Sequence, residues 1–303
     1  MIKHFLDLAD ISAEDLRNIL SKAARLKQER AAGKFYAPLA NKNLAMIFEK
    51  NSTRTRVSFE VAMVELGGHS IFLNGNDLQL GRGETVADTA RVLSRYVDAI
   101  TLRCHNHDKL IELAENSAVP VINALTEFSH PCQIVADILT FEENLGNIAG
   151  KTVAWVGDGN NVAQSWIHAA TLLGCKLNIA CPKSLSPLPE VVEWAAARGA
   201  DIKIMETPQE AVLNAHAVIT DTWVSMGDPN AEAQIALLRP YQVNSGLMKL
   251  AAPEAIFLHC LPAHRGEEVI AEVIDGLQSK VVDEAENRLH AQKAILLWCF
   301  GKC

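Results

Sequence analysis

The run S-T-R-T-R at residues 52–56 has the composition of an anion site. It follows an apolar segment and opens a helical pattern. The first turn of a helix offers unpaired N–H groups and the positive end of the helix dipole, which attract an anion. Hydroxyl and guanidinium donors suit a phosphate dianion. A capped helix start with solvated charges is the alternative, but five consecutive donors without an acid favour the anion site.

A second run, H-P-C-Q at residues 130–133, also precedes a helical pattern. Pro131 suits the first helical position, so part of this run is simply a helix start. A neutral imidazole and a primary amide can polarise a carbonyl group and hold an –NH2 group. Taken alone, His130 is more often a structural histidine than a ligand-binding one.

Two further runs follow apolar segments that resemble strands: D-T-W-V-S-M-G at residues 221–227 and H-C-L-P-A-H-R-G at residues 259–266. Ligands of open α/β sheets bind beyond the carboxyl ends of strands. Asp221 and Ser225 could bind an ammonium and a carboxylate together, although a turn with a local hydrogen bond explains that run equally well. Cys260 could relay a proton from an amine if its surroundings lower the thiol pKa.

Two patterns resemble cofactor sites without completing them. Cys104, His105 and His107 lack a second pair of ligands at zinc spacing, so we expect no metal. The segment 157–161 follows a strand pattern like a dinucleotide fingerprint, but Val162 stands at the third glycine position. Its asparagines are better suited to binding a polar substrate.

Short apolar runs alternate with helical patterns along the whole chain. This alternation is typical of an α/β fold with parallel sheets covered by helices on both faces. We expect helices that include residues 56–66, 85–96, 133–144, 162–173 and 191–197. We expect strands at residues 44–48, 70–73, 99–103, 120–124, 152–156, 177–180, 201–204, 217–220, 256–260 and 280–283.

A helical pattern ends in a glycine-containing segment near residues 146–151, which suggests a domain boundary. The sequence therefore predicts two doubly wound domains joined by a long helix over residues 131–145. The first comprises residues 1–145 with a closing helix at 287–303, and the second comprises residues 146–286.

The composition indicates a soluble globular protein: of 303 residues, 49% are apolar and 21% charged. A net charge of −8 argues against nucleic-acid or anionic-membrane partners. The seven scattered cysteines are typical of a reducing compartment. Neither a signal peptide nor an apolar run of membrane length is visible. We therefore expect a cytoplasmic location.

These runs, in this order, resemble the aspartate/ornithine carbamoyltransferase family. S-T-R-T-R, H-P-C-Q and the segment G-E-T at 83–85 followed by D-T-A-R at 88–91 are marks of the family. The D-T-W-V-S-M-G and H-C-L-P runs look like its ornithine-specific branch, because the aspartate branch lacks both this cysteine and an S-M-G loop. The resemblance implies transfer of a carbamoyl group from carbamoyl phosphate to the δ-amine of L-ornithine, without metal or organic cofactor.

The resemblance also implies roles for individual residues. The carbamoyl-phosphate contacts would be Ser52, Thr53, Arg54, Thr55 and Arg103 for the phosphate, Arg54, Thr55 and His130 for the carbonyl oxygen, Gln133 for the –NH2 group, and Gln79 and Arg288. The ornithine contacts would be Asn161 for the α-carboxylate, Asp221 for the α-ammonium, Ser225 and the backbone of Met226, Cys260 near the δ-amine, and the Leu261 carbonyl. In the family, the loop that carries Gln79 can serve a neighbouring subunit of a homotrimer or a multiple of trimers.

The δ-amine arrives protonated, because its ordinary pKa is about 10.4. It must lose that proton before it can attack a carbonyl group. Cys260 and Asp221 are the expected acceptors or relays, with the phosphate as an alternative. Arg54 and His130 would stabilise the charge that develops on the carbonyl oxygen.

Three other readings remain open from the sequence. The acceptor could be another amine, such as putrescine or an N-acylornithine. The second half could belong to a nicotinamide-dependent oxidoreductase. The chain could also be a catalytically silent structural relative, although such a relative is expected to have lost an arginine of the phosphate run or Cys260.

Overall fold

The computed structural model describes the chain except for residues 1, 76–77, 79–82 and 225–230. The chain divides into two compact units. Unit 1 comprises Met1–Leu139 and Glu286–Cys303, and unit 2 comprises Thr140–Ala285.

Unit 1 contains a four-stranded parallel sheet in the order β2-β1-β3-β4. The strands are β1 (Asn43–Phe48), β2 (His69–Asn74), β3 (Ala99–Arg103) and β4 (Val121–Leu125). The central strands β1 and β3 are near-continuous apolar runs, as expected for strands covered on both faces. The edge strand β2 is more exposed.

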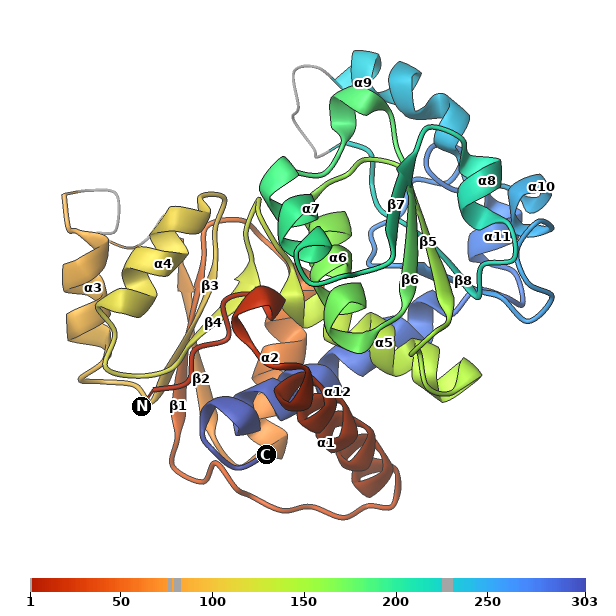
Figure 1. Ribbon diagram of the computed structural model, residues 1–303. Coiled ribbons are helices and arrows are strands. Elements are labelled where there is room, and N and C mark those ends of the chain that lie inside the picture. Colours follow the sequence, from red (N-terminus) through yellow and green to blue (C-terminus); the bar gives the residue numbers. More distant parts are fainter. Residues whose placement is uncertain (1, 76–77, 79–82, 225–230) are drawn as a thin grey trace. The chain divides into compact units, whose positions relative to one another are not determined.

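Helices follow the strands of unit 1 in alternation. They are α1 (Ala13–Ala31), α2 (Thr53–Glu65), α3 (Val86–Leu93) and α4 (His107–Glu115). Apolar residues of α3 and α4 pack against β1 and β3 in one core cluster. Figure 1 shows these two helices on one face of the sheet and α2 on the other.

Unit 2 contains a five-stranded parallel sheet in the order β7-β6-β5-β8-β9. The strands are β5 (Thr152–Val156), β6 (Lys176–Ala180), β7 (Ile202–Met205), β8 (Ala217–Thr220) and β9 (Ile256–His259). The chain runs outward from β5 to β7 and then returns to begin β8 on the other side of β5. The reversal between β5 and β8 is the position where open α/β sheets bind ligands.

The helices of unit 2 cover both faces of its sheet. They are α6 (Asn161–Leu173), α7 (Pro189–Ala196), α8 (Pro208–Val212), α9 (Ala231–Leu238), α10 (Ser245–Met248) and α11 (Ala271–Ile274). Residues of α8, α10 and α11 share one apolar cluster with β5, β8 and β9. Figure 1 shows α6 and α7 on the opposite face. The prediction of an α/β fold with parallel, helix-covered sheets is therefore confirmed.

Two long helices cross the division between the units along the chain: α5 (Pro131–Leu145) and α12 (Val281–Cys299). The part of α12 that belongs to unit 1 is fixed there by polar contacts. Lys293 Nζ donates to Glu65 Oε2 at 2.8 Å, and Trp298 Nε1 donates to Asp15 Oδ1 at 2.7 Å.

The prediction of a strand at residues 280–283 is wrong, because α12 begins at Val281. Two adjacent valines favour a strand by propensity. Asp283 and Glu284 in the first turn instead favour a helix start, because their charges complement the helix dipole.

Among the helices that the structure describes, none combines the length and the apolar character that a membrane span requires.

Candidate active site

The S-T-R-T-R run lies where β1 gives way to α2, and it forms the first turn of that helix. Ser52 is the N-cap, and its hydroxyl accepts a hydrogen bond from the backbone N–H of Thr55 at 3.4 Å. The same hydroxyl donates to Thr55 Oγ1 at 3.0 Å. No acidic residue stands in the first turn. The helix start therefore keeps the positive character that an anion needs.

Arg288 of α12 reaches this helix start from the far end of the sequence. Its Nη2 donates to Thr55 Oγ1 at 2.7 Å, and both side chains are buried. A buried guanidinium beside an acid-free helix start makes this corner of unit 1 strongly cationic.

His130 precedes α5 and lies within the field of the same cations. Burial lowers the pKa of its imidazole well below the ordinary value, and the charges of Arg288, Arg103 and Arg54 lower it further. His130 is therefore neutral at physiological pH. A neutral imidazole can donate one N–H without adding a charge that the arginines would repel.

Gln133 lies in the first turn of α5, and its side chain is fully buried. Its Nε2 donates to Asp137 Oδ1 at 2.8 Å, which fixes the orientation of the amide. Oε1 is then the atom with which Gln133 would accept an N–H group from a ligand. The structure thus brings several predicted residues together, and these are Ser52, Thr55, His130 and Arg288, with the charges of Arg54 and Arg103 acting on His130. Thr53 is instead exposed at the start of α2.

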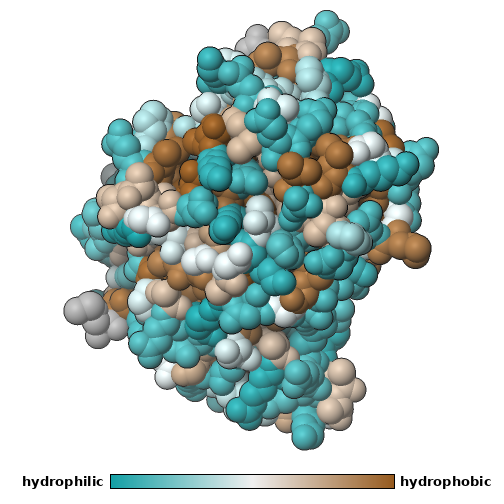
Figure 2. All heavy atoms as spheres, turned by 45° about the vertical axis from the view of Figure 1, so that its right-hand side comes forward, coloured by the Kyte–Doolittle hydropathy of each residue, from teal (hydrophilic) through white to brown (hydrophobic). Residues whose placement is uncertain are grey.

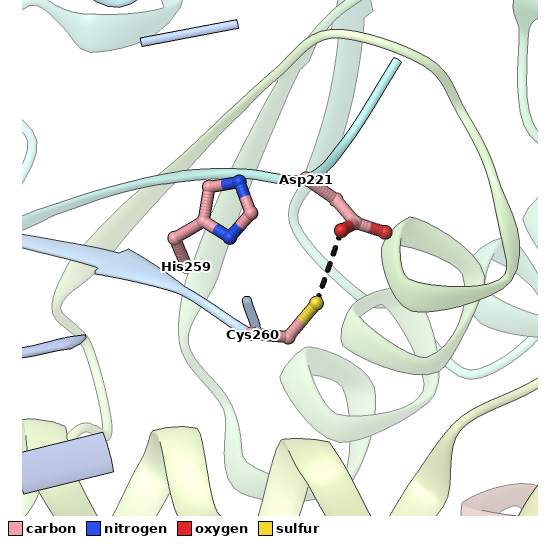
Figure 3. A group of neighbouring side chains, drawn as sticks. All are labelled: Asp221, His259 and Cys260. Carbon is pink, nitrogen blue, oxygen red and sulfur yellow. Dashed lines mark hydrogen bonds between the residues drawn. The ribbon is translucent and has the colours of Figure 1, made fainter. Parts of the chain in front are cut away.

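Asp221 and Cys260 are the first residues after β8 and β9, which pair in parallel. The two side chains meet, and Cys260 Sγ donates to Asp221 Oδ1 at 3.0 Å (Figure 3). The Asp221 carboxylate also accepts from its neighbour Thr222 N at 2.7 Å and from Asn160 Nδ2 at 3.0 Å. These bonds hold the carboxylate in one orientation beside the thiol.

His259 lies directly before Cys260 and is fully buried. Its Nδ1 accepts from Leu261 N at 2.9 Å, and its Nε2 lies 3.2 Å from Oε1 of the buried Glu268. Glu284 accepts from His259 N at 2.8 Å. This network fixes the backbone on both sides of Cys260.

Leu261 adopts the left-handed region at φ 57°, and the Leu261–Pro262 peptide bond is cis. A residue with a side chain rarely occupies this region, and such outliers gather at functional sites. The conformation turns the chain directly after the thiol, and Cys260 and Leu261 are both partly buried at this bend.

No local run in the sequence predicts two of the residues in this network. Glu268 and Glu284 contact His259 from nine and 25 residues away, and no local pattern signals those contacts. Asn160 donates to Asp221, and it also caps α6 by accepting from Val162 N. An asparagine before a helical pattern is a recognisable N-cap, so this signal was present in the sequence.

Asp158 is a further carboxylate at the same edge of the unit 2 sheet. Its Oδ2 accepts from Gln234 Nε2 at 3.2 Å, and the same Nε2 donates to Trp223 O at 2.7 Å. Burial, and to a smaller extent the charge of Asp221, raise the pKa of Asp158 to about 6.

Gln79, Ser225 and Met226 lie outside the described residues. The remaining predicted residues fall into two groups. Unit 1 holds Ser52, Thr53, Arg54, Thr55, Arg103, His130, Gln133 and Arg288, and unit 2 holds Asn161, Asp221, Cys260 and Leu261.

Among the residues that the structure describes, two groups of side chains have the donors and the spacing to hold a metal ion. One is Asp221, His259 and Cys260, and the other is His264, Glu267 and Glu268; the ligand atoms within each lie within 4.8 Å of one another. Cys104 instead donates to Asn106 O, and burial raises the pKa of its thiol to about 12. A thiol with so high a pKa is a poor metal ligand.

The glycine-rich segment after β5 has a packing explanation. A side chain on Gly159 would come within 2.4 Å of Pro187 N, and Gly159 N donates to Leu185 O at 2.8 Å. The glycine permits this close approach of two backbones. That is a different use from cradling a pyrophosphate.

The comparisons with known proteins agree over nearly the whole chain. The family model for the carbamoyl-P binding domain of aspartate/ornithine carbamoyltransferase matches residues 3–143, and the model for its Asp/Orn binding domain matches residues 149–299. An ornithine carbamoyltransferase of Rhodopseudomonas palustris is 60% identical over 302 residues, covering 99% of this chain and 97% of that protein. One of Rhizobium meliloti is 56% identical over 301 residues, covering 99% of each.

Solved structures give the same result. The ornithine carbamoyltransferase from Pyrococcus furiosus has a TM-score of 0.96 and 51% identity, covering 99% of this chain and 98% of that one. The enzyme from Burkholderia thailandensis has a TM-score of 0.92 and 45% identity, covering 99% of each chain. The chain belongs to the aspartate/ornithine carbamoyltransferase family.

Proposed function

We propose that this chain transfers the carbamoyl group of carbamoyl phosphate to the δ-amine of L-ornithine, giving L-citrulline and phosphate. The contact between Cys260 Sγ and Asp221 Oδ1 carries this proposal, because it joins the two runs that mark the ornithine branch. Relatives that are 56–60% identical over nearly the whole chain are named ornithine carbamoyltransferases.

Carbamoyl phosphate would bind to unit 1. Its phosphate would accept hydrogen bonds from Ser52, Thr53, Arg54 and Thr55 at the start of α2. Arg103 would add a further guanidinium group, and Arg288 would complete the site. The carbonyl oxygen would accept from Arg54, Thr55 and the neutral His130, and Gln133 would hold the –NH2 group. The acid-free helix start and the lowered pKa of His130 support this assignment.

L-ornithine would bind to unit 2. Asn161 would hold its α-carboxylate and Asp221 its α-ammonium, while Cys260 and the Leu261 carbonyl would face the δ-amine. The roles of Gln79, Ser225 and Met226 are proposed from the family alone.

The contact between thiol and carboxylate offers a route for the proton that the δ-ammonium must lose. The Cys260 thiol already donates to Asp221. As its proton moves to the carboxylate, the sulfur can take the proton from the amine. The neutral amine then attacks the carbonyl carbon, and fixed donors stabilise the oxygen as it gains charge. The bond to phosphate breaks, and phosphate departs with the bonding electrons. The departing phosphate takes the second proton from the nitrogen that attacked, which leaves the neutral ureido group of citrulline.

The alternatives receive less support. The similar proteins are named ornithine carbamoyltransferases, which disfavours putrescine or an N-acylornithine as the acceptor. A silent relative is expected to lack part of the site, whereas Arg54, Arg103, Arg288 and Cys260 are all present. We further propose a homotrimer or a multiple of trimers, a cytoplasmic location and a role in arginine metabolism. The seven scattered cysteines support a reducing compartment.

Phosphate release from carbamoyl phosphate, measured with the purified chain and a panel of acceptors, tests the proposal. The panel contains L-ornithine, L-aspartate, putrescine and N-acetylornithine. We expect rapid release only with L-ornithine. Preference for another amine would contradict the assignment of the acceptor, and no release with any acceptor would support the silent relative.

A further inference from the structure

Asp158 is a partly buried carboxylate for which the mechanism above has no use. It lies two residues beyond the end of β5, and Asp221 follows the adjacent strand β8 directly. Both side chains therefore belong to the sheet edge at the reversal of strand order. Within the described part of the chain, Asp158 forms no ion pair, and its carboxylate accepts a single bond, from Gln234.

Two neighbouring carboxylates that share no cation repel each other. Burial and the charge of Asp221 both oppose the ionised form of Asp158. An arriving ammonium group would remove this penalty, because it pairs with the charge that burial disfavours. The arrangement therefore favours the binding of a cationic group.

A second observation in the same place points to a ligand with a negative group as well. The Trp223 side chain is only 1% exposed, and its indole Nε1 has no hydrogen-bond partner in the described structure. This nitrogen would lie 3.5 Å from a side chain on Gly157, the residue next to Asp158. A buried donor without an acceptor is rare and costly.

Within the described residues, the segment 157–158 therefore carries a carboxylate that pairs with no cation, and beside it lies an indole N–H that has no acceptor. An α-amino acid carries the complementary pair, an ammonium and a carboxylate on one carbon atom. L-ornithine also carries a second ammonium at the δ position. That group must lose its proton to react, and a further carboxylate beside it would retain the proton.

We propose that Asp158 is the second carboxylate that binds the α-ammonium group of the acceptor, together with Asp221, and that it thereby selects α-amino acids. This inference rests on the proposed function. It leaves Asp221 Oδ1 to the proton route through Cys260. Asp158 is then a specificity residue, and its loss should weaken binding more than it slows the chemical step.

The variant Asp158→Asn tests the proposal, because it removes the charge and keeps an oxygen that can accept from Gln234. The probe is L-norvaline, which has the α-ammonium and α-carboxylate of ornithine but a methyl group in place of the δ-amine. We expect the KM for L-ornithine and the inhibition constant of L-norvaline to rise by the same factor, about tenfold or more. We expect kcat to change less than about threefold.

Glu206→Gln is the matched control. It also removes one negative charge from unit 2. The removed charge lies in the same region as Asp158, because the charges of Glu206 and Asp158 both raise the pKa of Cys181. Glu206 is exposed and pairs with Lys183 at 3.2 Å. This variant should leave both constants within about twofold, since an exposed ion pair contributes little.

Three results would overturn the proposal. A rise in the KM for ornithine with unchanged norvaline inhibition would assign Asp158 to the δ-amine. A fall in kcat alone would assign it to holding the Trp223 segment, and unchanged constants would leave it without a role. The wild-type rate with ornithine, measured in the same assay, separates failure of this inference from failure of the proposed function.

The unmodified protein provides a measurement that does not depend on the variant folding. Asp158 must be ionised to pair with an ammonium, and its titratable neighbours are Asp221 and Cys181. The inhibition constant of L-norvaline should therefore rise as the pH falls through about 6. A flat profile between pH 5 and pH 8 would contradict the proposal.

Discussion

The Thr55 hydroxyl joins distant parts of the sequence at the proposed phosphate site. It accepts from Arg288 Nη2 at 2.7 Å and from Ser52 Oγ at 3.0 Å, and the side chain is fully buried. A buried guanidinium needs its acceptors, because an unpaired buried charge is costly. The hydroxyl therefore orients an arginine that the sequence places 233 residues away.

Thr55→Val removes this hydroxyl with little change in shape. We expect the KM for carbamoyl phosphate to rise about tenfold or more, because Arg288 loses a charge-assisted bond, while the KM for ornithine stays within about twofold. Steady-state kinetics with each substrate varied in turn checks this. Thr101→Val is the matched control: Thr101 is also fully buried in unit 1, and its hydroxyl has no hydrogen-bond partner in the described structure. Equal effects of the two substitutions would contradict the role of Thr55.

Individual site residues could be predicted from the sequence only where they stand in a recognisable local run. Asp221 and Cys260 stand in recognisable runs at strand ends, and the structure brings them into contact. The contact of His259 with Glu268 and that of Asp158 with Gln234 depend on how separate segments pack. A single sequence contains no local signal for such pairs.

The helices and strands match the ranges expected from the hydrophobic pattern best where the intrinsic propensity of the residues and their burial favour the same element. The central strands of both sheets are apolar runs, and each lies close to its expected range. The start of α12 was missed because Val281 and Val282 favour a strand, whereas the tertiary structure buries one and exposes the other at 75%. Tertiary context overrode local propensity there.

The helix α12 also carries a buried histidine whose ionisation opposes folding. The pKa of His290 falls to about 4, mainly because of burial and in smaller part because of the charges of Lys293, Lys27 and Arg30. Below about pH 6.5 the unfolded chain binds a proton at this residue, whereas the folded protein binds it only near pH 4. Stability that depends on neutral His290 is therefore lost as the pH falls through this window.

His290→Gln should reduce the pH dependence of stability. Between pH 7 and pH 4 the wild-type protein should lose about 3 kcal/mol more unfolding free energy than the variant, since each pKa unit corresponds to about 1.4 kcal/mol. Urea unfolding at several pH values measures this difference. The exposed His69→Asn serves as the control and should retain the wild-type dependence. Parallel curves for wild type and His290→Gln would contradict the account of this histidine.

At the scale of the whole molecule, the surface bears on the proposed assembly. Figure 2 shows hydrophobic residues interspersed among hydrophilic ones on the visible face. In unit 1, Val57 and Val64 of α2 are 49% and 68% exposed, and Ile71 of the edge strand β2 is 46% exposed. Exposed apolar groups beside a sheet edge suggest an interface between subunits.

Light scattering should give three times the chain mass of 33.0 kDa, or a multiple of that value. Val64→Asp places a charge among these apolar residues and should reduce the mass to that of a single chain, because burying an unpaired charge is costly. Leu277→Asp is the control, since Leu277 is 99% exposed in unit 2. An unchanged mass for Val64→Asp would exclude this surface of α2 from the interface.

The central claim is that unit 1 binds carbamoyl phosphate and unit 2 binds ornithine. Calorimetric titration of carbamoyl phosphate into Arg54→Ala and Cys260→Ala tests it most directly, with thermal unfolding as a check that both variants fold. Arg54→Ala should bind carbamoyl phosphate at least about a hundredfold more weakly, because it removes a charge-assisted contact. Cys260→Ala should bind it as the wild type does, yet form citrulline far more slowly. Loss of carbamoyl-phosphate binding in Cys260→Ala with normal binding in Arg54→Ala would contradict the account.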